Sequence, residues 1–167
     1  MLPLPTARLV FREMVDADLD DMAALLGDPV VMRHYTRPRT RVEAQDWIDW
    51  SRRCYREHGF GLWVLTDAAT GEFVGDCGLT YQELDGVQEL EVGYQVRADR
   101  QGEGLATEAA TAVRDLARDV LRAPRLTAII KPDNVPSQRV ALKIGLALEK
   151  EVPHRLGGVV RLYSGVP

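Results

Sequence analysis

Hydrophobic residues recur at different periods in successive parts of the chain, and each period predicts its own kind of element. Residues 9–14 predict a strand. Two helices follow, a short one capped by Asp16 or Asp18 and a longer one that starts at the sequence Thr40-x-x-Glu43. This sequence is a capping box, in which the threonine and glutamate side chains satisfy the first free N–H groups of a helix. After the second helix the period changes to that of strands.

Three successive strands predict an antiparallel meander that ends at Val96. Asp85-Gly86 is a strong signal for the tight turn before its last strand, and Gly75 and Gly78 suggest a bulge in its middle strand. Beyond the meander, helices and strands alternate. They are predicted at 107–122 (helix), 126–130 (strand), 137–144 (helix), 146–152 (strand) and 159–163 (strand). This order predicts an α/β fold with a mixed sheet and helices on its faces.

The segment from Gln101 to Ala109 joins the meander to the most amphipathic helix of the sequence. Gly102 and Gly104 allow a tight turn that exposes consecutive N–H groups at the positive end of the helix. Such a turn can bind a phosphate or pyrophosphate, although a plain strand-to-helix turn is the alternative. One face of the helix is predicted to be buried: Ala106, Ala109, Ala110, Val113, Leu116, Ala117 and Val120.

Two other phosphate-binding motifs are excluded at this turn. A Walker P-loop ends in Gly-Lys-Ser or Gly-Lys-Thr, whereas Gly104 is followed by leucine and alanine. The dinucleotide fingerprint requires a third glycine or alanine where Thr107 stands, and an acidic residue on the next strand. The predicted strand at 126–130 carries no acidic residue.

Composition excludes several classes of protein. The chain of 167 residues is 46% hydrophobic and 28% charged, with a formal net charge of −4, so neither a nucleic-acid-binding footprint nor a membrane span of ~18 apolar residues is expected. Cys54 and Cys77 suggest reduced thiols in a cytoplasmic protein. No spacing of cysteine and histidine fits a metal site, so no metal is expected. The start of the chain lacks the apolar segment of a signal peptide.

Two motifs resemble those of one enzyme superfamily. Gln101-x-x-Gly104-x-Ala106 resembles the Gln/Arg-x-x-Gly-x-Gly/Ala signature of the GNAT superfamily of N-acetyltransferases. The segment from Asn134 through Ser137 to Gly145-Leu146 resembles the Asn-x-x-Ser…Lys-x-Gly-Phe segment of the RimJ/RimL-like branch, named for ribosomal-protein N-terminal acetyltransferases. The resemblance spans about residues 8–164, which implies a single acetyltransferase domain in the chain 1–167.

The resemblance implies a fold and a cofactor. The fold is a mixed, mostly antiparallel central sheet with helices on both faces, splayed between the two strands that flank the cofactor-binding helix. The cofactor is acetyl-CoA as co-substrate, whose pantetheine arm would bond the backbone of Tyr94, Gln95 and Val96 and which Asn134 would also contact. The pyrophosphate would lie on the glycine turn: Gln101, Gly102, Glu103, Gly104, Leu105, Ala106 and Thr107.

Two residues are candidates for the chemistry. The resemblance places Ser137 near the sulfur of CoA, as an acid for the leaving thiolate, because the tyrosine that other members use corresponds to Ala141 here. Alternatively, Ser137 only caps its helix. Glu91 is the candidate base for the amine, because a carboxylate within a central strand is costly without a task or a partner. Its alternative is a structural ion pair with an arginine. Glu89 is expected to be solvated.

The sequence as a whole predicts an N-acetyltransferase that moves an acetyl group from acetyl-CoA directly to a primary amine. The acceptor is a protein or peptide N-terminus or a small-molecule amine. No cysteine lies near the motifs to form a covalent intermediate. The basic run 33–41 offers an arginine for an acceptor carboxylate, or else is a solvated connector. A non-catalytic acyl-CoA-binding module is the alternative function, and a homodimer is left open.

Overall fold

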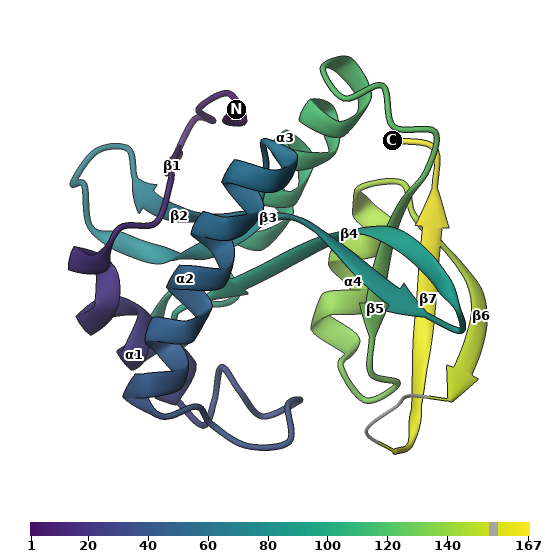
Figure 1. Ribbon diagram of the computed structural model, residues 1–167, viewed down its shortest axis with the longest axis horizontal. Helices are drawn as coiled ribbons and strands as arrows, with labels where there is room; N and C mark the ends of the chain where they lie inside the picture. The colour runs from purple at the N-terminus through teal and green to yellow at the C-terminus, as the bar shows by residue number, and fades with distance from the viewer. Residues whose placement is uncertain (154–156) are drawn as a thin grey trace.

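The computed structural model describes residues 1–153 and 157–167 (Figure 1). Its strands and helices follow the predicted order, and two short 3₁₀ helices are added. The strands are β1 (Leu9–Arg12), β2 (Leu62–Asp67), β3 (Phe73–Leu84), β4 (Val87–Val96), β5 (Leu126–Ile130), β6 (Ala147–Pro153) and β7 (Val159–Gly165). The helices are η1 (Asp16–Asp18), α1 (Leu19–Gly27), α2 (Arg41–His58), η2 (Ala98–Arg100), α3 (Leu105–Asp119) and α4 (Val135–Lys143).

The described strands form a seven-stranded sheet in the order β1-β2-β3-β4-β5-β7-β6. All neighbouring strands are antiparallel except β4 and β5, which are parallel. The long hairpin of β3 and β4 turns at Asp85 and Gly86, whose φ angles of 54° and 75° are those of a tight hairpin turn. The predicted mixed, mostly antiparallel fold is therefore confirmed.

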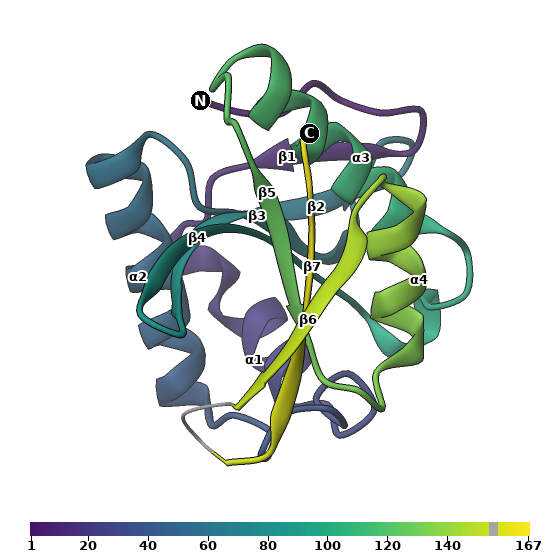
Figure 2. The ribbon, with the colours of Figure 1, turned by 90° about the vertical axis from the view of Figure 1, so that its right-hand side faces the viewer.

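Helices cover both faces of the sheet, as predicted (Figure 2). On one face, α1 and α2 pack on the buried side chains of Leu62, Val64 and Phe73. On the other face, α3 and α4 pack on a second core that includes Trp63 and Leu65. Neighbouring residues of β2 thus serve opposite cores, because successive side chains of a strand point to opposite faces.

The signals for the start and end of α2 are confirmed. The hydroxyl oxygen of Thr40 accepts the N–H of Glu43 at 3.3 Å, and the carboxylate of Glu43 accepts the N–H of Thr40 at 2.7 Å. Gly59 ends the helix with φ 78°. This cap fixes where α2 begins, and so where the preceding loop 28–40 must cross the sheet.

The two glycines of β3 have different roles. The β2–β3 register shifts where Gly75 pairs with Leu65 and Phe73 pairs with Thr66, which is the predicted bulge. At Gly78, a Cβ atom would lie 1.9 Å from the carbonyl oxygen of Gly61, so only glycine allows the two strands to approach this closely.

The sheet parts between β4 and β5, the strands that flank α3. Their only recorded pair within the described residues is Glu91 with Thr127. Figure 1 shows the two strands diverging beyond this point. This confirms the predicted splay, and it leaves one side of β4 after Glu91 without a partner strand.

Three details of the prediction were wrong. The helix α3 starts two residues earlier than predicted, at Leu105, and ends at Asp119. Val120 is 55% exposed and lies outside the buried face. The helix α4 starts at Val135 rather than at Ser137, because Asn134 caps it.

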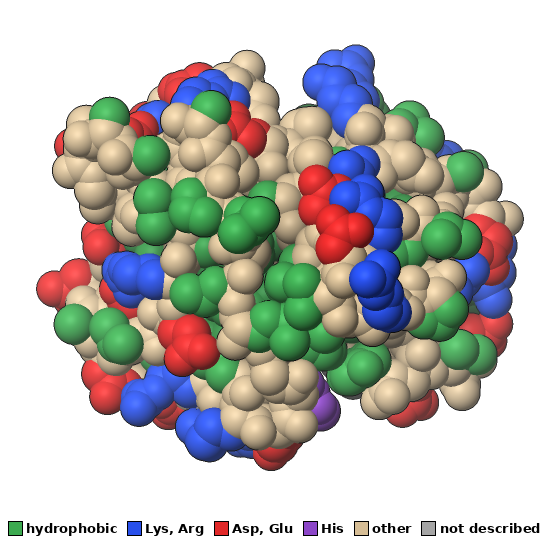
Figure 3. Space-filling model, turned by 90° about the horizontal axis from the view of Figure 1, so that it is seen from above, with side chains coloured by type: hydrophobic (Ala, Val, Ile, Leu, Met, Phe, Trp, Pro, Cys, Tyr) green, Lys and Arg blue, Asp and Glu red, His purple; other side chains and the backbone are tan. Residues whose placement is uncertain are grey.

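On the face shown in Figure 3, acidic and basic side chains lie beside one another.

Candidate active site

The turn before α3 presents backbone N–H groups without a side-chain cap. Gly104 is the N-cap residue, and no side chain of its own accepts the first N–H groups of the helix. Gly102 and Gly104 have φ angles of 84° and 83°, which L side chains rarely adopt. The conformation of the turn therefore requires glycine at both positions, as predicted. The positive end of α3 is open to an anion.

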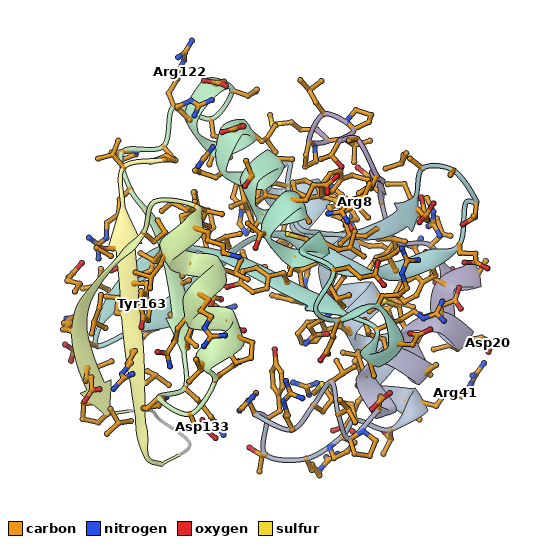
Figure 4. All side chains as sticks on the ribbon, turned by 180° about the vertical axis from the view of Figure 1, so that it is seen from behind. Arg8, Asp20, Arg41, Arg122, Asp133 and Tyr163 are labelled. Carbon is orange, nitrogen blue, oxygen red and sulfur yellow. The ribbon has the colours of Figure 1, made fainter. Side chains whose placement is uncertain are left out.

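The far side of this turn is fixed by the N-terminal segment. Arg8 donates to the carbonyl oxygen of Glu103 at 3.0 Å and pairs with Glu108 at 2.6 Å. Thr6 donates its hydroxyl to the same carboxylate at 2.6 Å. Figure 4 shows Arg8 beside the first turns of α3. Glu108 thus ties residues 6–8 to the turn.

A cleft of about 300 Å³ opens in front of the turn and is called the cofactor cleft here. Six of the seven residues predicted for the pyrophosphate line it. Glu103 does not line it, and its carboxylate bonds Arg100. Tyr94, Gln95, Val96 and Asn134 line it too. Arg139 and Lys143 of α4 add two cations that sequence reasoning missed, although their spacing of four residues on a helix signals a shared face.

The backbone of β4 faces this cleft at Tyr94 and Val96. Arg97 donates its N–H to Val74 of β3 at 2.9 Å, and hydrogen-bonded pairs alternate along an antiparallel ladder. The next pair bonded to β3 is therefore Gln95 with Asp76, and the N–H groups of Tyr94 and Val96 point to the other side. Because β5 has diverged there, these groups are available to a ligand.

Tyr94 joins the two sides of the splay. Its hydroxyl donates to the backbone oxygen of Ser137 at 2.8 Å, and so ties β4 to the first turn of α4. Asn134 accepts the N–H of Ser137 at 3.2 Å. The alternative that Ser137 caps α4 is therefore wrong, since Asn134 is the cap and Ser137 lies inside the helix.

A second cavity of about 320 Å³ adjoins the cofactor cleft and is called the reaction chamber here. Ser137, Tyr94 and Asn134 line both hollows, whereas Glu91 lines the chamber and not the cleft. The structure thus brings the two predicted catalytic residues to one cavity. His34 and Tyr35 of the loop before α2 also line both hollows, and they close the chamber from the opposite side.

Glu91 lies where β4 and β5 part. Its carboxylate accepts the N–H of Ile129 at 3.2 Å, and within the described residues it has no ion pair with an arginine or lysine. Within the described residues, the structural ion pair considered for Glu91 is therefore not found. Burial raises the pKa of Glu91 to about 7, although the bonds from Ile129 and Thr80 favour the charged form.

The buried ion pair belongs instead to Glu89. Its side chain is buried and bonds Arg125 at 3.0 Å, and Arg125 also binds Glu149 at 2.7 Å. The expectation of a solvated Glu89 is wrong, because β5 and β6 bring these partners from distant parts of the chain. Glu91 and Glu89 lie on the same face of β4, and yet among the described residues only Glu89 is paired with a cation.

Tyr35 was missed as a site residue. Its hydroxyl accepts a hydrogen bond from the Gln95 amide at 2.9 Å, so its own proton is free to be donated into the hollows that it lines. Burial raises the pKa of Tyr35, which keeps the phenol protonated. No sequence signal identified Tyr35, because its position depends on how the loop after α1 crosses the sheet.

Two negative findings concern the part of the chain that the structure describes. Residues 1–153 and 157–167 contain no group of three or more histidine, cysteine or acidic side chains that could hold a metal ion. Nor does any described helix combine the length and apolar character needed to cross a membrane.

Comparison with known proteins identifies the family. Residues 8–147 match the model of the acetyltransferase (GNAT) domain. The chain is 35% identical over 150 residues to the uncharacterized protein YkkB of Bacillus subtilis, covering 89% of this chain and 87% of that protein. It is 29% identical to the uncharacterized N-acetyltransferase p20 of Bacillus licheniformis, covering 98% and 88%. The chain belongs to the GNAT acetyltransferase family and is an acyltransferase that uses acetyl-CoA.

Solved structures share this fold. An acetyltransferase from Agrobacterium tumefaciens aligns over 99% of this chain and 94% of its own, with a TM-score of 0.86 and 25% identity. RimL, a ribosomal L7/L12 alpha-N-protein acetyltransferase solved in complex with coenzyme A, aligns over 99% and 97%, with a TM-score of 0.80 and 14% identity. At this identity the likeness to RimL concerns the fold.

Proposed function

We propose that the chain acts as one acetyltransferase domain that transfers the acetyl group of acetyl-CoA directly to a primary amine in the reaction chamber. The observation that carries this proposal is that Glu91 and Ser137 line one cavity, which adjoins the cofactor cleft. Acetyl-CoA supplies an acyl group activated as a thioester. The new C–N bond forms as the C–S bond breaks, and CoA leaves.

The cofactor fits the residues of the cleft. The uncapped N–H groups of α3 and the side chains of Arg139 and Lys143 provide donors and positive charge for a pyrophosphate. The N–H groups of Tyr94 and Val96 suit the amide groups of an extended pantetheine arm, because strand addition is a known mode of recognition. These residues, with Gln101, Gly102, Gly104–Thr107 and Asn134, form the proposed binding site.

Glu91 is the proposed base. An amine attacks only as the free base, so its ammonium form must first lose a proton. A carboxyl group with a pKa near 7 is suited to take that proton at neutral pH, directly or through a water molecule. The absence of a cationic partner for Glu91 among the described residues supports this role, because an ion pair would keep its pKa low.

Ser137 is the proposed acid for the departing thiolate. Its backbone is held twice, by Asn134 at the N–H and by Tyr94 at the carbonyl oxygen, which fixes where the hydroxyl can reach. Ala141, which corresponds to the tyrosine of other members, is fully buried. Because alanine has no proton to donate, the hydroxyl of Ser137 is the candidate acid on α4. A thiolate needs little help to leave.

The motif at Asn134–Leu146 supports a place in the RimJ/RimL-like branch, and RimL is one of the neighbours by fold. Other neighbours by fold are a spermidine N-acetyltransferase and an aminoglycoside acetyltransferase, with TM-scores of 0.71 and 0.75. The fold thus serves protein N-termini and small amines alike. A CoA-binding module without turnover has no observation in its favour beyond the alanine at position 141.

The direct test is release of CoA thiol from acetyl-CoA with a panel of primary amines, which includes peptides with free N-termini, amino acids and polyamines. We expect acetylated product in equal amount to the CoA released, with at least one amine. Binding of acetyl-CoA without transfer to any of these amines would contradict the proposal.

A further inference from the structure

The reaction chamber carries more positive charge than the transfer of an acetyl group to an amine requires. Arg39 and Lys131 line it, and the one acidic side chain among its described lining residues is Glu91. The proposed role as base explains the carboxylate of Glu91. Nothing in the proposed chemistry requires the positive charges of Arg39 and Lys131. They therefore point to a feature of the acceptor itself.

Arg39 is held in place without a carboxylate partner. Its guanidinium carbon lies 5.1 Å from the ring centre of Trp47, and the indole N–H of Trp47 donates to the buried Asp76 at 3.0 Å. The N–H of Arg39 itself donates to the carbonyl oxygen of Leu26 at 2.8 Å. Its buried Nε atom has no hydrogen-bond partner among the described residues, so the protein leaves this guanidinium with unused donor capacity.

Other arginines of the same loop differ in this respect. Arg37 bonds Glu43 at 2.6 Å, and Arg41 bonds Asp20 at 2.5 Å. Figure 4 shows the labelled Arg41 and Asp20 at the outer edge of the molecule. Neither of these arginines lines the chamber. Among the described residues, Arg39 has no carboxylate within ion-pair distance.

Arg39 and Glu91 line the same chamber and yet do not bond one another within the described structure. A carboxylate and a guanidinium that share a cavity without pairing can bind a ligand with the opposite arrangement of charges. We propose that the acceptor is an amine that also carries a carboxylate, of the α-amino acid class, with its amino group at Glu91 and its carboxylate on Arg39. This inference rests on the proposed function for the place of the amine.

A polycationic acceptor is the competing class. A groove of about 1030 Å³ adjoins the chamber at Tyr35, Arg39 and Glu91, and it is lined by further acidic residues. Two of them are neutralised, Glu43 by Arg37 and Asp85 by Lys150. The other two, Asp46 and Glu83, are exposed, so water screens them. The partly buried Arg39 is therefore the stronger determinant, because a hydrogen bond to a charge gains strength away from water.

The test compares acceptors that differ only in the carboxylate. L-amino acids with varied side chains are each compared with the amine obtained by decarboxylation, at one pH, with release of CoA thiol as readout. The decarboxylated amine is the right comparator, because an amino-acid amide also lowers the pKa of its own amine. We expect kcat/KM, divided by the fraction of each acceptor that is free amine at that pH, to favour the amino acid by at least ~10-fold, the effect of one charge-assisted hydrogen bond.

Two variants identify the residue responsible. Arg39→Gln should remove most of this preference by raising KM for the amino acid, and it should change kcat/KM for the decarboxylated amine little. Arg41→Gln, the matched control in the same loop, should keep the parent preference. The melting temperature and acetyl-CoA affinity of each variant establish that it folds. If Arg39→Gln fails to fold, the preference of the parent enzyme decides alone.

The inference is overturned if decarboxylated amines or spermidine are better acceptors than amino acids, or if Arg39→Gln lowers kcat/KM equally for both members of a pair. If no amine is acetylated, the proposed function has failed, and binding of the same pairs in the presence of CoA still tests the inference by calorimetry. Tighter binding of the amino acid, lost in Arg39→Gln, supports it, and equal binding overturns it.

Discussion

The carboxylate of Glu91 on β4 accepts the backbone N–H of Ile129 on β5 at 3.2 Å. This bond lies just past the single recorded pair of the two strands, Glu91 with Thr127. A side chain thus satisfies the N–H group that the diverging ladder would leave free. The same divergence opens the chamber beside Glu91, so one feature of the sheet creates the cavity and positions the proposed base within it.

Removing the flexibility of the glycine turn should abolish binding of acetyl-CoA. Gly104→Val places a β-branched residue at φ 83°, which L side chains rarely adopt, and so distorts the turn whose N–H groups are proposed to bind the pyrophosphate. A Cβ atom there would lie 3.8 Å from the guanidinium of Arg8. We expect calorimetric affinity for CoA to fall roughly 100-fold or more, about 2.7 kcal/mol. Gly71→Val is the control, since Gly71 has φ 75° in the β2–β3 turn, away from the cleft. Equal affinity in both variants would mean that the turn is not the pyrophosphate site.

Loss of the Ser137 hydroxyl should slow transfer and leave binding intact. Alanine keeps the N–H that Asn134 accepts and the carbonyl oxygen that Tyr94 donates to, so α4 should keep its position. We expect Ser137→Ala to lower kcat roughly 10-fold to 10²-fold, at the low end for general acid assistance. Ser164→Ala removes a hydroxyl on β7 as the control. A parent-like kcat for Ser137→Ala would show that the thiolate leaves unaided.

The buried Asp76 should make the protein less stable as the pH rises. Burial raises the pKa of Asp76 from its ordinary value of 3.8 to about 7, against the opposing bonds from Trp47 and the Gln95 N–H. A carboxyl group whose folded pKa is raised contributes full stability below its unfolded pKa, and that contribution is lost as pH rises through the folded pKa. Glu91, raised in the same direction, adds to the slope.

Between about pH 4 and pH 7, the free energy of unfolding should therefore contain a falling component of roughly 3–4 kcal/mol from Asp76. In Asp76→Asn the slope over this range should be smaller, whatever the offset caused by the changed hydrogen bonds. Urea titrations at several pH values measure both quantities. An identical slope in the parent and the variant would show that Asp76 does not titrate in this range.

The fold was largely predictable because its signals are local. The capping box at Thr40 and the Asp85-Gly86 turn each depend on a few neighbouring residues, and each matches the structure. The prediction placed the starts of α3 and α4 two residues too late. Both helices begin after a cap, Gly104 for α3 and Asn134 for α4, that lies before the hydrophobic pattern begins.

The candidate site was predictable only where it lies on such local motifs. The glycine turn, Asn134 and Ser137 belong to short segments of the sequence, and they line one cleft. Tyr35, Arg39 and the burial of Glu89 depend on contacts across the sheet with Gln95, Trp47 and Arg125. The basic run 33–41 predicted an arginine for an acceptor carboxylate, but which arginine it is, and the roles of Tyr35 and Glu89, depend on these contacts and appeared only in the structure.

The pH dependence of the rate in Glu91→Gln tests the account most directly. Glutamine can still accept the N–H of Ile129, so the strands should stay in place while the base is lost. We expect kcat/KM at neutral pH to fall by 10²–10⁴-fold, and the rate to recover in part as the pH rises and more of the amine is free. Glu89→Gln, on the same face of β4 but outside the chamber, should keep the parent profile. Full activity of Glu91→Gln at neutral pH would contradict the account.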